Sequence, residues 1–265
     1  MKQKYGVCQW CLPVNGLECC DAVSSLGLDG MELEYTEELK KQAKAYRQRS
    51  HDLGIALPTM GMNVFCDHSY TRAEGYSFFV EQIKQALEIA DEIGLQILQI
   101  PAFFESAIRT DDALKCAAEC LHAACELARP LKLRVGTENA LTKEQNLRLF
   151  QMVDEDNLAF YFDTQNLLQM EGLPDNGLLE AMRDRLCEMH VKDCILGTAP
   201  IEWTVLGTGE TGFMDTLSNV KRLNYQGWIH LENDYHASIR GAEGLNWKDA
   251  LRLDLDIVRK AMENE

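Results

Sequence analysis

Short apolar segments alternate with longer amphipathic segments along the whole chain. The segment at 187–193 is typical of the short ones, because its polar and apolar positions alternate and no helical period fits them. We predict strands at 5–12, 30–34, 55–60, 95–100, 131–137, 158–162, 186–191 and 227–231. These eight strands are spread over nearly the full length of the sequence.

The longer segments predict helices between the strands, at 36–53, 72–93, 111–129, 176–184, 213–223 and 247–262. Gly54 and Gly94 stand where the C-caps of the first two are expected. Thr142 and Gln145 have the spacing of a capping box and predict the start of a further helix. The stretch 194–212 is the longest one predicted to be irregular.

This alternation of strands and helices indicates βα units and a parallel sheet. Eight such units in 265 residues favour a closed (β/α)8 TIM barrel over a doubly wound sheet, since such a barrel takes about 250 residues. No stretch is rich enough in Pro, Gly or Ser to form a linker. We therefore predict one α/β barrel domain over residues 1–265, with its active site at the carboxyl ends of the strands.

Four of the predicted strands lead to a residue that can bind a metal ion. Glu138, Asp163, His190 and Glu232 stand at the ends of the fifth, sixth, seventh and eighth strands. Three carboxylates on one rim would raise one another's pKa, and a bound divalent cation resolves this. Oxygen ligands with one imidazole suit Mn²⁺ first, with Mg²⁺, Co²⁺ or Zn²⁺ as alternatives. The sequence therefore predicts one divalent ion held by these four side chains.

A second layer is expected below these ligands. Glu188 lies two residues before His190, and His230 lies two residues before Glu232. The alternation of side chains along a strand points both of them into the barrel. Because an unpaired buried charge is costly, we predict that Glu188 and His230 contact each other. Gly136, two residues before Glu138, is expected to leave space beneath the ion.

Composition and charge narrow the choice of partners. Hydrophobic residues make up 46% of the chain and charged residues 26%, which is ordinary for a globular protein. The formal net charge is −16. Such an acidic surface repels phosphate backbones, so we expect no nucleic-acid partner.

Neither a signal peptide nor a run of about 20 apolar residues is evident, and there are ten cysteines. We therefore expect a cytoplasmic protein with reduced thiols and no membrane partner. Cys8 and Cys11 have a Cys-x-x-Cys spacing, but a strand would point them to opposite faces. No second pair completes a zinc site, so we expect both to be structural.

Several motifs resemble those of the xylose-isomerase-like TIM barrels, in their sugar-phosphate isomerase/epimerase branch. They are Gly-Thr-Glu-Asn at 136–139, Phe-Asp-Thr-Gln-Asn at 162–166, His-Val-Lys-Asp at 190–193, Leu-Gly-Thr-Gly-Glu-Thr-Gly-Phe at 206–213 and Leu-Glu-Asn-Asp at 231–234. By this resemblance, the four residues named above match the family's metal ligands, and Glu138 and Glu232 match its acid/base pair. The family includes ketose and ketose-5-phosphate 3-epimerases and inosose dehydratase.

The resemblance implies a metal-dependent isomerase or epimerase of a small sugar or sugar phosphate, which removes a proton next to a carbonyl through an enediolate. A metal-dependent lyase or dehydratase of a keto-polyol stays open as the alternative, because it begins with the same proton removal. Two other functions are disfavoured. A DNA-repair endonuclease of this fold would need more histidines and a basic groove. A non-catalytic subunit would tolerate loss of a glutamate, yet both glutamates are present. Members of this family often form oligomers, so the resemblance implies that this chain forms a homo-oligomer.

Five further residues are candidates for substrate binding. Asn166 stands three residues after Asp163, where epimerases of free ketoses often carry histidine, and this difference resembles the ketose-phosphate 3-epimerases. Lys192 belongs to a His-x-Lys-Asp motif that is similar to theirs. Trp10 follows the first strand as a candidate wall for a sugar face, and His68 lies on a predicted rim loop.

The glycines at 207, 209 and 212 form a Gly-x-Gly-x-x-Gly pattern. It follows a long loop and precedes the last strand, so it does not predict a dinucleotide site. Gly209 is instead a candidate for a turn that cradles a phosphate, with a purely structural turn as the alternative.

Overall fold

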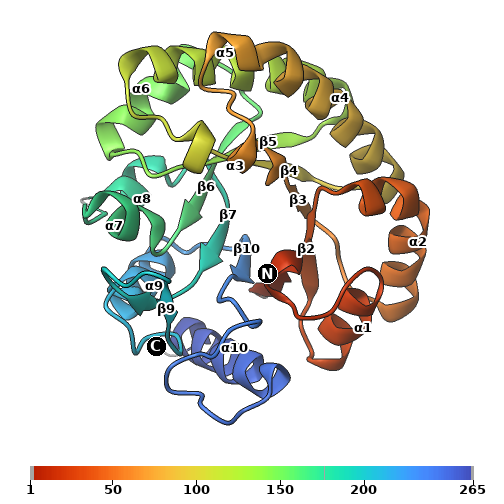
Figure 1. Cartoon of the computed structure of the whole chain (residues 1–265), viewed down its shortest axis with the longest axis vertical. Helices are drawn as coiled ribbons and strands as arrows, with labels where there is room; N and C mark the ends of the chain where they lie inside the picture. Colours follow the sequence, from red (N-terminus) through yellow and green to blue (C-terminus); the bar gives the residue numbers. More distant parts are fainter. Residues whose placement is uncertain (1–2, 176, 264–265) are drawn as a thin grey trace.

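The computed structural model describes residues 3–175 and 177–263. Eight parallel strands close into a barrel in the order β1-β10-β7-β6-β5-β4-β3-β2 (Figure 1). They are β1 (Lys4–Cys8), β2 (Gly30–Glu34), β3 (Thr59–Gly61), β4 (Ile97–Pro101), β5 (Arg134–Glu138), β6 (Leu158–Asp163), β7 (Leu186–Val191) and β10 (Trp228–Leu231). The predicted (β/α)8 barrel is confirmed.

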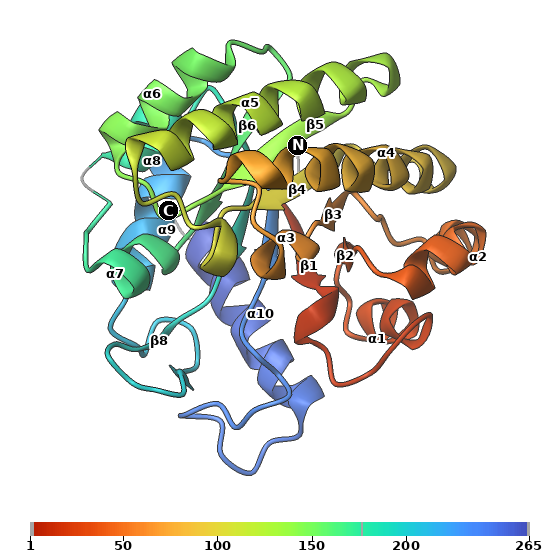
Figure 2. The same cartoon turned by 45° about the horizontal axis from the view of Figure 1, so that its top comes forward.

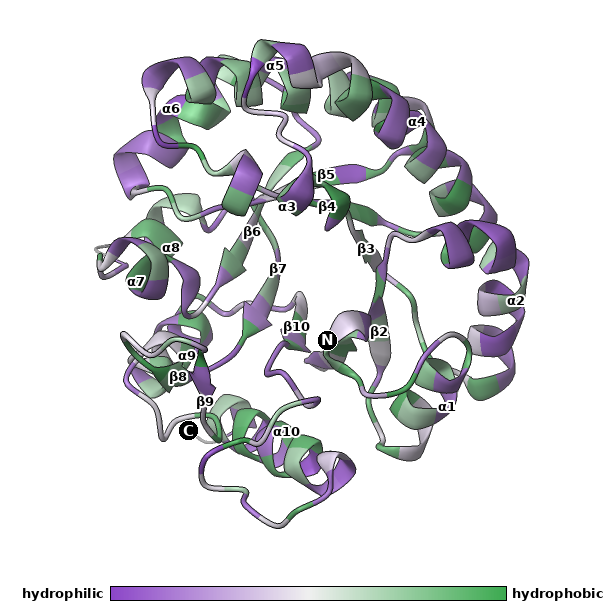
Figure 3. Ribbon diagram, viewed as in Figure 1, coloured by the Kyte–Doolittle hydropathy of each residue, from purple (hydrophilic) through white to green (hydrophobic). Residues whose placement is uncertain are grey.

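Long helices surround the strands on the outside of the barrel, and the short α3 lies inside this ring, next to β4 (Figures 1 and 2). The helices are α1 (Glu18–Ser25), α2 (Glu37–Leu53), α3 (Val64–Asp67), α4 (Tyr76–Ile93), α5 (Asp111–Ala128), α6 (Lys143–Val153), α7 (Asn166–Glu171), α8 (Leu178–Met182), α9 (Phe213–Arg222) and α10 (Trp247–Glu263). Figure 3 shows apolar and polar residues in alternating patches along the long helices, as expected of helices with one face on a core.

The helix ends follow from local chemistry. Thr142 and Gln145 form the predicted capping box at the start of α6. Gly54 and Gly94 end α2 and α4 in the left-handed conformation, at φ 67° and 86°. The short helices α1 and α7 were not predicted, because one or two turns are too short to show a clear period. Residue 176, the first of the predicted helix 176–184, lies outside the described residues.

Several predicted strands differ from the observed ones. The fourth and fifth begin later than predicted, at Ile97 and Arg134, and Leu131 lies in a 3-10 turn. The first ends at Cys8, because a 3-10 turn, η1 (Gln9–Cys11), replaces its last part. The third is shorter and begins after Pro58, which has no N–H to donate to a neighbouring strand. Within the loop after β7 lies a small hairpin of β8 (Cys194–Ile195) and β9 (Glu202–Trp203).

The main apolar core lies between strands and helices, and the barrel interior is largely polar at the carboxyl ends of the strands. Further down, a small apolar cluster of Ile97, Ala159, Tyr161 and Cys187 fills the interior. A Cβ at Gly136 would lie 3.1 Å from the Cys187 sulfur. Gly136 therefore allows this cluster to pack, and the expectation that it leaves space beneath an ion is wrong.

The state of the cysteines and the length and polarity of the helices relate to the expected reduced thiols and to the expected lack of a membrane partner. All ten cysteines are free thiols. Among the described residues, every helix is too short or too polar to cross a membrane.

Candidate metal centre

The four predicted ligands converge at one end of the barrel. Glu138 and Asp163 are the last residues of β5 and β6, His190 lies in β7, and Glu232 directly follows β10. Asp163 and His190 are paired in the register of their two strands. One ligand atom from each of the four side chains lies within 4.8 Å of the others. Parallel strands with aligned carboxyl ends thus bring together residues that are far apart in sequence.

His190 lies at the middle of this group and is fully buried. Its Nδ1 is 3.3 Å from Glu138 Oε1 and 3.2 Å from Glu232 Oε2. Its Nε2 is 2.8 Å from Glu32 Oε2. Burial alone would lower the pKa of His190, but the surrounding carboxylates outweigh it and hold the pKa well above its usual range.

The two glutamates lie in different surroundings. Glu138 accepts hydrogen bonds from Gln99 Nε2 at 2.5 Å and from Asn166 Nδ2 at 2.8 Å. Burial raises the pKa of Glu138, although His190 partly opposes it. Glu232 accepts from Trp10 Nε1 at 3.1 Å and from Lys192 Nζ at 2.5 Å. Burial would raise the pKa of Glu232 too, but His190 and Lys192 together hold it well below its usual range.

Asp163 and Lys192 complete the charged group. Asp163 Oδ1 accepts backbone hydrogen bonds from Gln165 and Asn166, at 2.8 and 2.6 Å. Its Oδ2 is 3.2 Å from Lys192 Nζ. Burial raises the pKa of Asp163. Burial would lower the pKa of Lys192, but the carboxylates of Asp163 and Glu232 hold it well above its usual range.

This donor set fits a divalent cation. It offers three carboxylates and one imidazole from four neighbouring strand ends. Oδ2 of Asp163 is buried and accepts no hydrogen bond among the described residues. With His190 neutral as a ligand, three carboxylates and one ammonium leave a charge of −2, which a divalent ion neutralises.

Three of the candidate substrate residues lie at this centre. Trp10, in η1, donates to Glu232 and meets the His190 ring edge-on, with ring centroids 5.8 Å apart. Asn166 and Lys192 contact Glu138 and Glu232 as described above. His68 is different, because its exposed ring stacks on Phe78 with a centroid distance of 4.7 Å. None of the contacts found for His68 in residues 3–175 and 177–263 is to the four ligands.

The glycine-rich turn has a structural role. Asp193 Oδ2 accepts hydrogen bonds from the N–H groups of Gly207 and Gly209, both at 2.9 Å, and Oδ1 accepts from Thr211 Oγ1 at 2.7 Å. A Cβ at Gly209 would lie 2.2 Å from Asp193 Oδ1. An internal carboxylate therefore occupies the N–H groups that a phosphate would need. These contacts favour the structural alternative over a phosphate cradle at Gly209.

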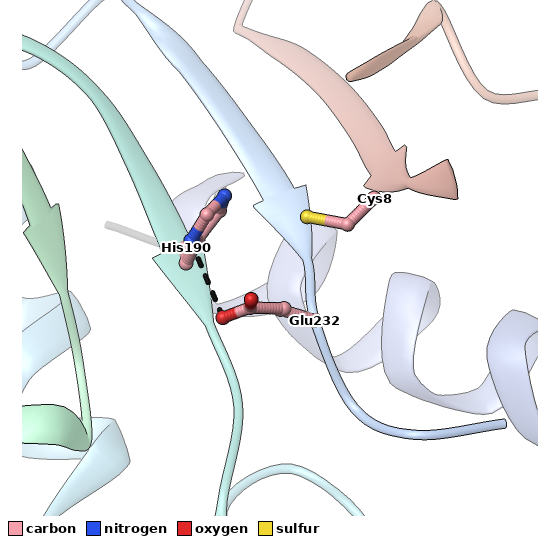
Figure 4. Close-up of side chains that lie close together, drawn as sticks. All are labelled: Cys8, His190 and Glu232. Carbon is pink, nitrogen blue, oxygen red and sulfur yellow. Dashed lines mark ion pairs between the residues drawn. The ribbon is translucent and has the colours of Figure 1, made fainter. Parts of the chain in front are cut away.

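Some residues at the centre were not predicted from the sequence. The Cys8 thiol points toward His190 and Glu232 from the end of β1 (Figure 4), with one potential ligand atom of each within 4.8 Å of the others. The 3-10 turn also brings Cys11 near Cys8, so the expectation of opposite faces is wrong. Burial raises the pKa of both thiols. Glu32 was missed as well, although a glutamate between Met31 and Leu33 in a buried strand is a signal in itself.

The predicted layer below the ligands is present. His230 Nε2 lies 3.4 Å from Glu188 Oε2, and both side chains are buried. This confirms the predicted contact, although its geometry is that of an ion pair rather than a hydrogen bond. Thr59 donates a hydrogen bond to the same Glu188 oxygen.

Comparisons with known proteins agree with this architecture. A model of the xylose isomerase-like TIM barrel family matches residues 20–261. The 2-epi-5-epi-valiolone 7-phosphate 2-epimerase of an Actinoplanes species is 25% identical over 274 residues, which cover 100% of this chain and 96% of that protein.

Solved structures show the same fold at low sequence identity. D-psicose 3-epimerase from Clostridium cellulolyticum H10 superposes with a TM-score of 0.74 at 16% identity, over 99% of this chain and 100% of its own. The 3-keto-D-glucoside 4-epimerase from E. coli gives a TM-score of 0.76 at 20% identity, over 98% of this chain and 100% of its own.

Proposed function

The chain belongs to the xylose isomerase-like TIM barrel family, and on that premise we propose that it is a divalent-metal-dependent epimerase or isomerase of a small sugar or sugar phosphate. The convergence of Glu138, Asp163, His190 and Glu232 carries the proposal. The similar proteins support it, because they are named as epimerases of a 7-phosphate compound, of D-psicose and of a 3-keto-D-glucoside.

The four convergent side chains would hold the ion, for which Mn²⁺ is our first choice. A bound divalent ion supplies a positive charge that polarises a substrate carbonyl and stabilises charge developing on its oxygen. All further steps belong to the side chains around it.

Two carboxylates on either side of the reacting carbon are what an epimerisation requires. His190 Nδ1 lies 3.3 Å from Glu138 Oε1 and 3.2 Å from Glu232 Oε2, so the glutamates flank it from different strands. One glutamate takes a proton from the carbon next to the carbonyl, which leaves an enediolate. The other returns a proton on the opposite face. Because the reaction is reversible, each serves as base in one direction and as acid in the other.

The neighbouring polar groups have complementary tasks in this proposal. Lys192 Nζ reaches both Asp163 and Glu232, so its ammonium lies where it can also bind a substrate oxygen. Asn166 and Gln99 fix the two oxygens of Glu138. Trp10 holds Glu232 through its indole N–H and offers an aromatic wall to the sugar.

Deuterium exchange tests the proposal. The full chain is loaded with Mn²⁺ and incubated in D₂O with a panel of ketoses and ketose phosphates. We expect one panel member to gain deuterium at the carbon beside its carbonyl and to yield an epimer or isomer. Loss of water from a keto-polyol, without return of the proton, would contradict the proposal and identify a dehydratase.

A further inference from the structure

Glu32 lies in the barrel interior, outside the four proposed ligands. It stands at the middle of β2, and its side chain is fully buried. Glu32 Oε2 is 2.8 Å from His190 Nε2 and accepts a hydrogen bond from Tyr161 Oη at 2.6 Å. In the barrel order, β1 and β10 separate β2 from β7, so this carboxylate reaches His190 across the interior.

The two nitrogens of His190 face different groups. Nδ1 faces the carboxylates of Glu138 and Glu232, and Nε2 faces Glu32. An imidazole that binds a cation through Nδ1 must present a lone pair there, so its proton must stay on Nε2. Glu32 Oε2 also accepts a hydrogen bond from Tyr161, and as an acceptor toward Nε2 it selects the tautomer with the proton on that nitrogen.

The His190 ring is also held on its faces and edge. Tyr161 packs against it with ring centroids 4.6 Å apart, and Trp10 meets it at 5.8 Å. Tyr161 thus touches the His190 ring and donates its hydroxyl to Glu32 at the same time. A lone buried carboxylate would be costly, and these two hydrogen-bond partners offset that cost at one oxygen.

We propose that Glu32 is a positioning residue, which orients His190 through Nε2 so that Nδ1 faces the cation. This inference rests on the proposed metal-dependent function. It assigns a role to a fully buried acid that lies outside the four proposed ligands.

Glu188 provides a matched control in the same layer. It is another buried glutamate of the barrel interior, with a carboxylate oxygen within 4.8 Å of one of Glu32, but the groups it pairs with are His230, 3.4 Å away, and Thr59. Glu188→Gln therefore removes one buried charge at a similar depth without removing the hydrogen-bond partner of His190.

Co²⁺ binding to the full chain tests the role of Glu32. Calorimetric titration gives the affinity, and the visible absorption spectrum of bound Co²⁺ reports its coordination. We expect Glu32→Gln to weaken Co²⁺ binding about 10- to 100-fold and to change the spectrum. Glu188→Gln is expected to keep the wild-type affinity and spectrum, even where its melting temperature falls.

Tyr161→Phe is the second variant, because it keeps Glu32 and removes only one hydrogen bond to it. We expect a smaller loss of Co²⁺ affinity than in Glu32→Gln, and this variant keeps the test decisive if Glu32→Gln does not fold. Wild-type affinity in Glu32→Gln, or in Tyr161→Phe where Glu32→Gln does not fold, would overturn the inference alone, and so would an equal loss in Glu188→Gln. A wild-type protein that binds neither Co²⁺ nor Mn²⁺ would overturn the proposed function with it.

Discussion

Glu138 and Glu232 carry the same functional group in opposite electrostatic surroundings. Glu138 is held by two neutral amides and also contacts His190, but burial outweighs the imidazole and raises the pKa of Glu138. Glu232 has His190 and Lys192 beside it, and their positive charges more than offset its burial and lower its pKa. Two similar acids that are pushed apart in this way are typical of sites that hold a proton at one position and accept one at another.

Replacing either glutamate tests its part in proton transfer. We expect Glu138→Gln and Glu232→Gln each to lower kcat by at least about 100-fold, because an amide neither accepts nor returns the proton. Circular dichroism should show an unchanged fold, and Glu119→Gln on the exposed face of α5 serves as the control. Full activity in Glu138→Gln or in Glu232→Gln would show that other residues perform the chemistry.

Asp254 of α10 is a buried acid with a structural task. It accepts hydrogen bonds from Leu206 N, Asn233 Nδ2 and Tyr235 Oη, at 2.9, 2.8 and 2.9 Å. Burial nevertheless raises the pKa of Asp254 from 3.8 to about 6. Between these two values the folded protein holds a proton that the unfolded chain has released, so this group stabilises the fold most at low pH.

The stability contributed by Asp254 should therefore be present below about pH 4 and lost as the pH rises through about 6. As the pH rises through this window, we expect the free energy of unfolding of the wild type to fall relative to that of Asp254→Asn. The fall should reach up to about 3 kcal/mol. Denaturant titrations of both proteins at several pH values measure it. A difference that does not depend on pH would contradict the expected pKa.

At the scale of elements, the loop after β7 is organised around one carboxylate. Asp193 follows Lys192 and accepts hydrogen bonds from the N–H groups of Gly207 and Gly209. Gly207 has φ 81°, and Gly209 lies too close to Asp193 to carry a side chain. The glycine pattern thus shapes a turn next to the proposed substrate lysine.

Gly209→Ala should loosen this turn, because its Cβ would displace the Asp193 carboxylate. We expect faster hydrogen exchange at the amides of Gly207 and Thr211, measured by NMR, and a loss of about 1–3 kcal/mol of stability. Gly197→Ala in the same loop is the comparison, since a Cβ there meets nothing within 4 Å although the φ of 73° strains an alanine. It should lower stability without faster exchange at Gly207 and Thr211. Unchanged exchange in Gly209→Ala would show that the turn does not depend on Asp193.

Sequence reasoning reached those features that depend on local pattern. Strand alternation placed all four ligands at strand ends, and the spacing of Thr142 and Gln145 predicted a helix start. The Glu32–His190 contact could not be predicted in this way, because it joins residues 158 positions apart and depends on how the closed barrel turns its interior side chains. The turn after Cys8 was missed because an apolar run looks the same in a strand and in a single 3-10 turn.

At the scale of the whole molecule, four neighbouring strands contribute to one cation site. An ion that binds only the folded barrel should raise its stability by about 2.7 kcal/mol at a free concentration of 100 times its Kd. We expect Mn²⁺ to raise the melting temperature, EDTA to reverse the effect, and Asp163→Asn to abolish it. A melting temperature that changes with neither Mn²⁺ nor EDTA would contradict the proposed metal site.

The net charge of −16 leads to a prediction about nucleic acid. Because DNA is also strongly negative, it should be repelled by the protein. We expect the Kd for duplexes containing an abasic site to be weaker than about 100 µM at physiological salt. Fluorescence anisotropy with a labelled duplex measures this. Tight binding would favour the endonuclease alternative.

The pairing of β1 with β10 has a consequence for synthesis on the ribosome. The first strand of the chain finds its second neighbour only when the last strand has been made. A nascent chain that ends before Trp228 already contains Glu138, Asp163 and His190, yet β1 and β7 both present open edges. The barrel can therefore close, and the ligand set can be complete, only after residues 228–232 have been added to the chain.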